Sequence, residues 1–154
     1  MENEGCRLLL SHFRDNELPV VYLQHVSNRP GATFMLPDTN GINIHKTLMP
    51  LTSETVITKH FPNSFRETGL EAFLVAQGIK RLILCGMMSH MCVDATVRAA
   101  FDLGFECVVP HDACTTGNLQ FGDQVIDVPQ VHGAFMAALG AVYAQILTTE
   151  ECVQ

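Results

Sequence analysis

The chain is short of positive charge: nine Lys and Arg stand against 16 Asp and Glu, which gives its 154 residues a formal net charge of −7. Because the basic residues are too few to form a patch that attracts a phosphate backbone, we expect no nucleic-acid partner. No apolar run approaches the roughly 18 residues that a membrane span requires, which predicts no membrane partner. The pattern of a secretory signal peptide is also missing at the start of the sequence.

The sequence also lacks C-x-x-C pairs, although it contains six cysteines. Most of these cysteines lie within apolar runs, which is typical of reduced thiols and favours a cytoplasmic protein over a disulfide-stabilised secreted one. With 47% hydrophobic residues, a chain of this length can bury one substantial core. We therefore predict a single domain over residues 1–154.

Short apolar or β-branched runs alternate with longer stretches of helical periodicity, which is the pattern of an α/β fold. Apolarity within the runs is continuous, so both faces of each predicted strand are covered, as in a doubly wound, mostly parallel sheet with helices on both faces. The predicted strands are Val20–His25, Thr55–Thr58, Arg81–Cys85, Glu106–Pro110 and Ala144–Thr148.

The predicted helices carry their own start and stop signals. Thr68 and Glu71 form a possible capping box before a helix over Leu70–Gln77, and Gly78 supplies a left-handed stop. Gly104 ends the helix that begins at Cys92 in the same way. Two more helices are predicted over Pro129–Leu139 and over Glu2–Asn16, the latter with Leu8, Leu9, His12 and Phe13 as its buried face, and Ser27–Pro50 reads as a long irregular loop.

Cys92 follows the predicted strand Arg81–Cys85 and a turn over Gly86–Met91, and it opens the next helix. The unpaired N–H groups of a helix start favour the thiolate form of a cysteine, which is the nucleophilic form. A free cysteine is more often a small buried hydrophobe, so this position needs support from other residues.

Support comes from a resemblance carried by several segments. Gly86–Val93, with the small-residue helix and the Gly104–Ala113 segment that follow, resembles the isochorismatase-like cysteine hydrolases, a superfamily that includes nicotinamidases and carbamoylsarcosine amidases. Lys59–Phe65 resembles the lysine segment of that family, and His132–Leu139 resembles its last helix. The resemblance extends from about Glu17 to the C-terminus and implies a Rossmann-like doubly wound fold.

The resemblance also implies a reaction. The family uses an aspartate, a lysine and a cysteine, and the motifs place Cys92 and Lys59 in the last two roles; without the resemblance, Lys59 would read as a surface residue. A Cys92 thiolate would attack a small amide, form an acyl-thioester and release the acid to water, with no cofactor. Backbone N–H groups of Met88 and Cys92 would form the oxyanion hole, next to a cis peptide between Met87 and Met88.

The aspartate of this triad has no counterpart in the sequence. In the family it ends a central strand that lies between the strands matching Val20–His25 and Arg81–Cys85, and Asp15, Asp94 and Asp112 all stand elsewhere. We therefore expect a domain that is incomplete at its N-terminus, with costly unpaired backbone groups beside the place of the first strand. The alternative function is a catalytically impaired, shortened relative that binds small molecules or forms oligomers.

Further residues are predicted near the substrate. Phe34, Asn63, Phe65 and His90 are candidates for binding a small-molecule substrate, although the phenylalanines fit core packing equally well. The Asp-x-His metal pattern of nicotinamidases is broken at His25–Ser27, so we predict no metal, despite a possible ligand set of His25, His45, His60, His90 and His111. Relatives commonly assemble, which predicts a homo-oligomer. Some relatives hydrolyse the vinyl ether of isochorismate without the cysteine, a reaction that the presence of Cys92 disfavours.

Overall fold

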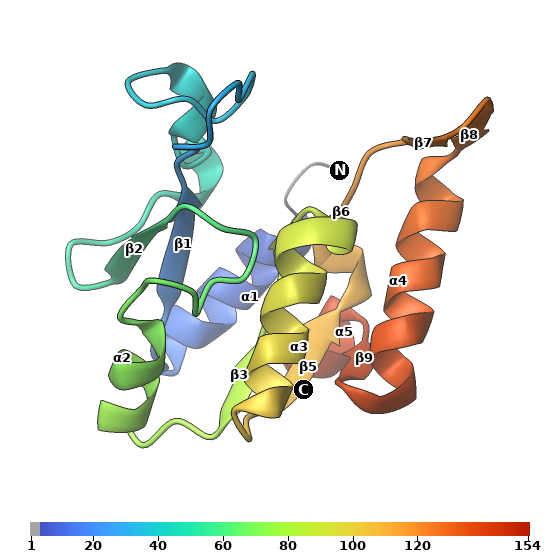
Figure 1. Ribbon diagram of the computed structural model, residues 1–154. Helices are drawn as coiled ribbons and strands as arrows, with labels where there is room; N and C mark the ends of the chain where they lie inside the picture. The colour runs from blue at the N-terminus through green and yellow to red at the C-terminus, as the bar shows by residue number, and fades with distance from the viewer. Residues whose placement is uncertain (1–3) are drawn as a thin grey trace.

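The computed structural model describes residues 4–154, and its parallel strands are divided between separate sheets (Figure 1). Strand β1 (Val21–His25) pairs with β2 (Thr55–Lys59), with His25 opposite Lys59. Strands β3 (Arg81–Ile83), β5 (Glu106–Pro110) and β9 (Gln145–Leu147) form a second parallel sheet in the order β3-β5-β9. The predicted α/β class with parallel pairing is confirmed.

A seam separates the two sheets. Within residues 4–154, β1 pairs only with β2 and β3 pairs only with β5, so no described strand joins β1 to β3. This seam lies where the sequence analysis placed the absent central strand. The position of the two sheets relative to each other therefore depends on contacts other than a strand ladder.

The predicted strand Arg81–Cys85 is interrupted. Strand β3 ends at Ile83, and a short strand, β4 (Gly86–Met87), follows and pairs in parallel with β6 (Cys114–Thr115). Between them, the Leu84 N–H still donates to the Val108 carbonyl at 2.9 Å. The chain thus continues along the sheet in two pieces and delivers the turn before Cys92 to the carboxyl ends of the strands.

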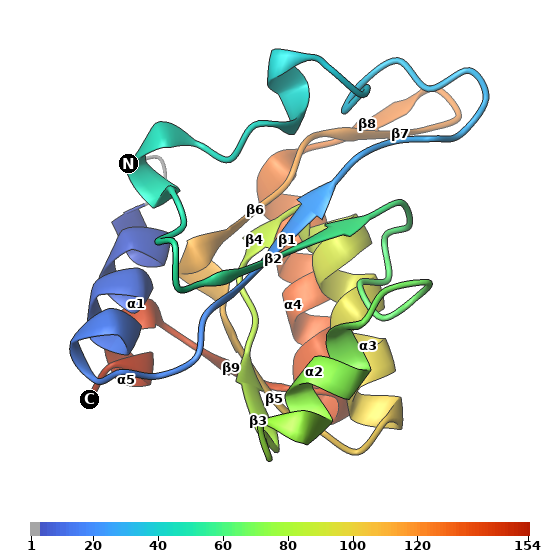
Figure 2. The ribbon, with the colours of Figure 1, turned by 90° about the vertical axis from the view of Figure 1, so that its left-hand side faces the viewer.

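Helices cover both faces of the β3-β5-β9 sheet. Figure 2 shows α1 (Glu4–Asp15) and α5 (Thr149–Cys152) on one side and α2 (Leu70–Ala76), α3 (Asp94–Asp102) and α4 (Val128–Val142) on the other. The main core lies on the second side, where it buries Leu70, Leu74, Val93, Val97, Ala100, Phe105, Cys107, Val109, Met136 and Leu139. None of the helices in the described part of the chain has the length and hydropathy of a membrane span.

Two local predictions about the helix starts are wrong. The N-cap of α2 is Gly69 and not Thr68, although the Thr68 hydroxyl accepts the Leu70 N–H at 3.3 Å while it donates to the Ser64 carbonyl at 2.6 Å. The helix after the Met88 turn begins with a π-helical segment, Ser89–Val93, that leads into α3. The predicted stops at Gly78 and Gly104 are confirmed, since their φ angles are +66° and +90°.

The other helices and the long loop differ from prediction in detail. Helix α1 buries Leu9, 5% exposed, whereas Leu8 is 45% exposed and does not belong to the buried face; the predicted start at Glu2 lies outside the described residues. Helix α4 is longer than predicted, mainly at its C-terminal end, and Asp127 and Gln130 form a capping box at its start. Two short 3₁₀ turns, Asn40–Ile42 and Lys46–Leu48, lie in the irregular loop, and an unpredicted hairpin joins β7 (Leu119–Phe121) to β8 (Gln124–Ile126).

Helix α1 is one connection across the seam (Figure 2). Near its start, the Cys6 thiol donates to the Ala113 carbonyl at 3.4 Å, beside the β3-β5-β9 sheet. Near its end, the Arg14 guanidinium forms two bonds to the Glu54 carboxylate, at 2.8 and 2.9 Å, beside β2. One rigid helix is therefore bound to both sheets.

The side chain of Thr96 on α3 is a second connection. Its Oγ1 accepts the Ser64 N–H at 3.1 Å, lies 2.9 Å from Ser64 Oγ and donates to the Pro62 carbonyl at 3.3 Å. Thr96 and Ser64 are both buried. Because Pro62 and Ser64 follow β2 whereas α3 packs on β5, this one hydroxyl joins the two halves of the fold.

Replacing Glu54 with Gln tests the α1 connection. The Arg14 guanidinium holds the pKa of the Glu54 carboxyl below its ordinary value of 4.5, so the pair stabilises the fold above that pH and its contribution is lost as the pH falls through the folded pKa. Near neutral pH we expect Glu54→Gln to lower the free energy of unfolding by about 2 kcal/mol in urea titrations. Glu67→Gln, at an exposed pair 3.7 Å from Arg66, is the matched control with little effect. A Glu54→Gln deficit that stayed constant down to acid pH would contradict this account.

Thr96→Val tests the second connection, because valine keeps the shape of threonine and removes the hydroxyl. The buried Ser64 N–H and O–H would lose their shared acceptor, so we expect a loss of about 2 to 4 kcal/mol in the free energy of unfolding. Thr96→Ser keeps the hydroxyl and loses only a methyl group, at a cost of about 1 kcal/mol. Equal urea midpoints for the two variants would show that the hydroxyl does not hold the halves together.

Candidate active site

Lys59 is a buried ammonium at the carboxyl end of β2. Its residue is 3% exposed, which rules out a surface lysine. The Nζ group donates to the carbonyls of Phe61 and Pro62, each at 2.9 Å, and lies 3.5 Å from His25 Nδ1. These acceptors match the three N–H groups of an ammonium, so its charge has a fixed position.

This ammonium lacks an anionic partner in the part of the chain that the structure describes. The ion pairs found in residues 4–154 all use arginines, namely Arg14, Arg66 and Arg98. A buried charge held only by neutral dipoles keeps a large desolvation cost. Burial lowers the pKa of the neighbouring His25, and the positive charge of Lys59 lowers it further. The His25 ring is therefore neutral near pH 7.

Cys92 lies in the π-helical segment Ser89–Val93, in the first turn of the helix that continues as α3. The Met88 carbonyl accepts the N–H groups of Met91 at 3.0 Å and Val93 at 3.2 Å, so two bonds fix the segment to Met88. The predicted cis peptide between Met87 and Met88 is confirmed. The Cys92 thiol is half-buried and belongs to a free cysteine.

The lysine segment is bound to the helix that carries Cys92. Thr96 lies four residues after Cys92, so the two side chains share one face of this helix. Thr96 bonds to the Pro62 carbonyl, which in turn accepts a hydrogen bond from Lys59. Sequence reasoning missed Thr96, although its spacing of four residues from Cys92 was a usable signal.

The predicted substrate-binding residues are not gathered in one place. Phe34, on the long loop, is 49% exposed. Phe65 packs against the core and stacks on Phe105 at 6.0 Å between centroids, which is the core-packing alternative. Asn63 uses its Oδ1 to accept the Phe65 N–H at 2.9 Å. His90 lies within the Ser89–Val93 segment, two residues before Cys92, and its ring contacts Phe135 edge to face.

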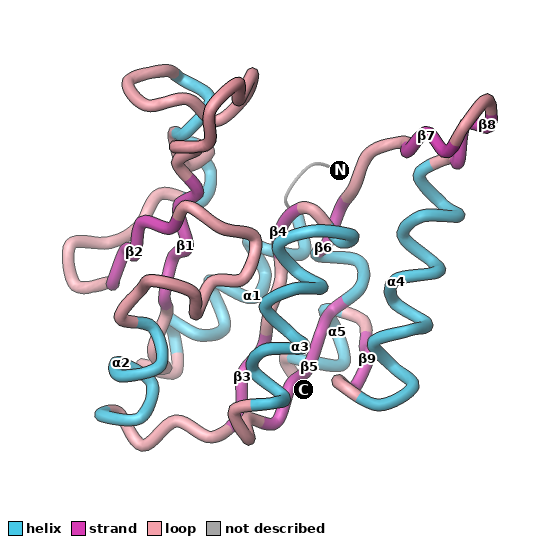
Figure 3. The backbone as a smooth tube through the Cα atoms, viewed as in Figure 1, coloured by secondary structure: helices cyan, strands magenta, loops and turns pink. Residues whose placement is uncertain are grey.

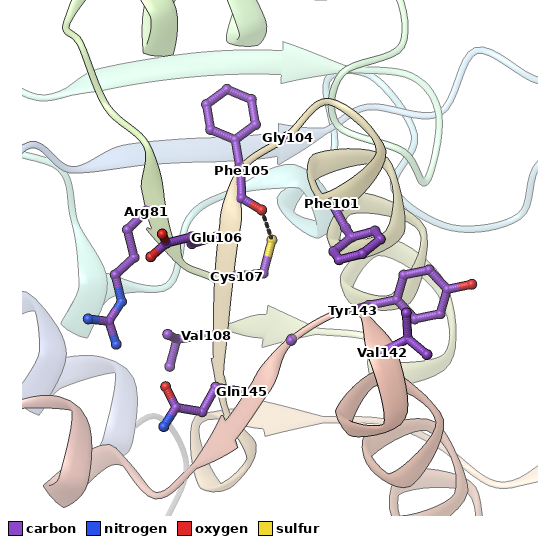
Figure 4. A pocket seen from close by; sticks show the side chains of 11 residues that line it. Arg81, Phe101, Gly104, Phe105, Glu106, Cys107, Val108, Val142, Tyr143 and Gln145 are labelled. Carbon is purple, nitrogen blue, oxygen red and sulfur yellow. Dashed lines mark hydrogen bonds between the residues drawn. The ribbon is translucent and has the colours of Figure 1, made fainter.

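Neither of two clefts formed by residues 4–154 is lined by Lys59 or Cys92. The first, of about 570 Å³, lies at the amino ends of the β3-β5-β9 strands, where Figure 4 shows Arg81, Glu106 and Gln145. Ligands of open α/β sheets bind at the opposite, carboxyl ends. The second, of about 630 Å³, lies between Gln24 and residues 40–50. Gln24 is on the face of β1 opposite to that of His25, so this cleft is turned away from Lys59.

Histidines considered as metal ligands make other contacts. His45 Nδ1 bonds to the Thr47 hydroxyl at 2.8 Å, and His60 Nδ1 bonds to the Val26 carbonyl at 2.7 Å. In residues 4–154, no three side chains of His, Cys, Asp or Glu are placed to hold a metal ion together.

Known proteins are similar to this chain in both sequence and fold. Residues 3–151 match the isochorismatase domain. The isochorismatase family protein YddQ of Bacillus subtilis is 51% identical over 147 residues, which cover 96% of this chain and 82% of that protein. An isochorismatase hydrolase structure from Oleispira antarctica, 43% identical, superimposes with a TM-score of 0.93 over 99% of this chain and 80% of that chain. Figure 3 shows the backbone of this chain, with its helices and strands.

Named hydrolases are among the relatives. Streptothricin hydrolase of Streptomyces noursei is 39% identical over 80% of this chain and 44% of that protein. Shorter matches include proteins named ureidoacrylate amidohydrolase. With the domain match across residues 3–151 and the parallel sheets that carry Lys59 and the Cys92 turn, this chain belongs to the isochorismatase family of hydrolases.

Proposed function

We propose that this chain is a cysteine-dependent hydrolase that cleaves the C–N bond of a small amide through an acyl-thioester. The observation that carries the proposal is the buried Lys59 ammonium, which is held by the same Pro62 carbonyl that binds the helix of Cys92. A fixed positive charge beside a helix start favours a thiolate. The amidohydrolases in the family support a C–N bond as the target.

The proposed reaction has two stages. In the first, the Cys92 sulfur attacks the amide carbonyl, and the oxygen becomes an anion bound by the N–H groups of Met88 and Cys92. When this intermediate collapses, the amine departs with the proton that the thiol released. In the second stage, water attacks the thioester, and the acid leaves as Cys92 regains its thiol.

Lys59 acts in this scheme as a fixed charge and not as a proton donor. Its N–H groups are directed at the Phe61 and Pro62 carbonyls and at His25, so they are committed to positioning the ammonium. In this proposal the charge stabilises the anionic sulfur and the anionic intermediate by electrostatic attraction. The proton of the thiol needs a separate acceptor.

A carboxylate is the missing part of this proposal. Within residues 4–154, no carboxylate forms an ion pair with Lys59, so the family's aspartate has no counterpart at this position. This same observation favours a second candidate, a catalytically impaired relative that binds a small molecule. Assembly into a homo-oligomer stays a prediction for either candidate.

Cys92→Ala should abolish release of amine or ammonia from a panel of small primary amides and ureido compounds, with kcat falling by at least about 10³-fold. Cys152→Ala is the matched control, because this half-buried cysteine lies in the C-terminal helix α5 and should leave turnover unchanged. Ammonia is measured with a coupled assay, and the acyl-enzyme by mass spectrometry. Ammonia release that survives in Cys92→Ala would contradict the role of Cys92 as nucleophile, whereas hydrolysis of isochorismate by this variant would favour the vinyl-ether reaction.

Added formate should raise the rate of amide hydrolysis in a saturable manner, because a small carboxylate can take the position next to Lys59 and accept the thiol proton. Sodium chloride at equal ionic strength is the control for screening. Lys59→Met should remove the formate effect, since it removes the charge that holds the anion. A wild-type chain that shows no turnover with or without formate, yet binds amides, would support the impaired relative.

A further inference from the structure

Ser89 is the most deeply buried residue of the Cys92 segment, with 0% exposure. Its hydroxyl lies 2.8 Å from His132 Nδ1 on α4 and 3.2 Å from the Thr115 carbonyl of β6. A serine and a histidine at hydrogen-bond distance resemble a nucleophile and its base, but a sulfur or oxygen nucleophile must be reached by substrate. The complete burial of Ser89 excludes that role and leaves a structural one for the pair.

The direction of the bond follows from the protonation of His132. Burial lowers the pKa of His132, and the neighbouring His111 charge lowers it further, so the ring is neutral near pH 7 with a single N–H. The Thr115 carbonyl can only accept, so it takes the single hydroxyl proton of Ser89. The Ser89 oxygen is then free to accept the single N–H of the neutral ring at Nδ1, 2.8 Å away.

Helix α4 forms a firm platform for this contact. Its first turn is closed by the capping box of Asp127 and Gln130, and it packs directly against the Ser89–Val93 segment. Phe135, one turn after His132, contacts the His90 ring with centroids 6.1 Å apart. Two successive residues of the Cys92 segment thus rest on one face of α4.

We propose that His132 is a positioning residue for Cys92: by holding the buried Ser89 hydroxyl, it sets the direction of the turn that presents the Cys92 sulfur and the Met88 and Cys92 N–H groups. Ser89 lies between these two donors in the chain, directly after Met88 and before Cys92, so a shift of Ser89 moves both of them. The catalytic consequence rests on the proposed function of Cys92. A displacement of about 1 Å at such a site costs about 10²-fold in rate.

The test uses four variants of the described chain. His132→Phe keeps the ring and removes both nitrogens, whereas His132→Asn keeps a polar atom close to the Nδ1 position. Ser89→Ala removes the partner hydroxyl. Gly133→Ala is the matched control, because it lies next to His132 on α4 and a Cβ there meets nothing within 4 Å.

We expect His132→Phe and Ser89→Ala each to lower kcat by about 10- to 100-fold with little change in KM. The double variant should be no slower than either single variant, because both break the same bond. His132→Asn should recover most of the rate, and Gly133→Ala should match the wild type. The rate of Cys92 alkylation by iodoacetamide, followed by mass spectrometry, should show the same ranking.

The alkylation readout separates this inference from the proposed function. If no variant, including the wild type, hydrolyses amides, the proposed function fails, and the alkylation ranking still decides the role of His132. Wild-type alkylation and turnover in both His132→Phe and Ser89→Ala would overturn the inference. If His132→Phe does not fold, Ser89→Ala and His132→Asn carry the comparison, and additive losses in their double variant would also overturn it.

Discussion

A single threonine hydroxyl connects the two parts of the candidate site. Lys59 ends a strand of the β1-β2 sheet, whereas Cys92 follows the β3-β5-β9 sheet, and no described strand joins these sheets. The Thr96 side chain binds both Pro62 and Ser64, so the lysine segment is attached to the helix of Cys92 one turn beyond the sulfur. The relative position of charge and thiol therefore depends on a buried polar contact, which is strong only while every partner is satisfied.

The charge of Lys59 explains why this contact is required. Carbonyl groups of Phe61 and Pro62 turn back toward the ammonium, and this turn is what brings Ser64 against α3. A neutral apolar residue at position 59 would remove the hydrogen bonds that hold the Phe61 and Pro62 carbonyls in this turn. The same charge lowers the pKa of His25 and remains without an anionic partner in the described chain, so the site holds more positive charge than its dipoles offset.

The features that sequence predicted are those set by local residues. Continuous apolar runs gave the parallel strands, and Gly78 and Gly104 gave helix stops, because a left-handed φ is a property of one residue. The capping box predicted at Thr68 is wrong because the cap is Gly69, although the Thr68 hydroxyl still accepts the Leu70 N–H while it donates to the Ser64 carbonyl. Other features depend on segments that meet only in the folded chain, so no local pattern predicted them. These are the interruption of β3, the roles of Thr96 and His132, and the exposure of Leu8.

The segment that carries Cys92 has supports on three elements. Thr115 of β6 and His132 of α4 hold Ser89, and Thr96 of α3 fixes the helix that follows. These supports have different consequences when they are lost. The Thr96 hydroxyl hydrogen-bonds both the N–H and the hydroxyl of the buried Ser64. The Ser89 hydroxyl, in contrast, still has its hydrogen bond to the Thr115 carbonyl if His132 is lost. Loss of Thr96 therefore leaves buried donors unpaired and acts on stability, while loss of His132 leaves the fold paired and acts on direction. Thr96 thus keeps the two parts of the site together, whereas His132 sets the orientation of the segment that carries Cys92.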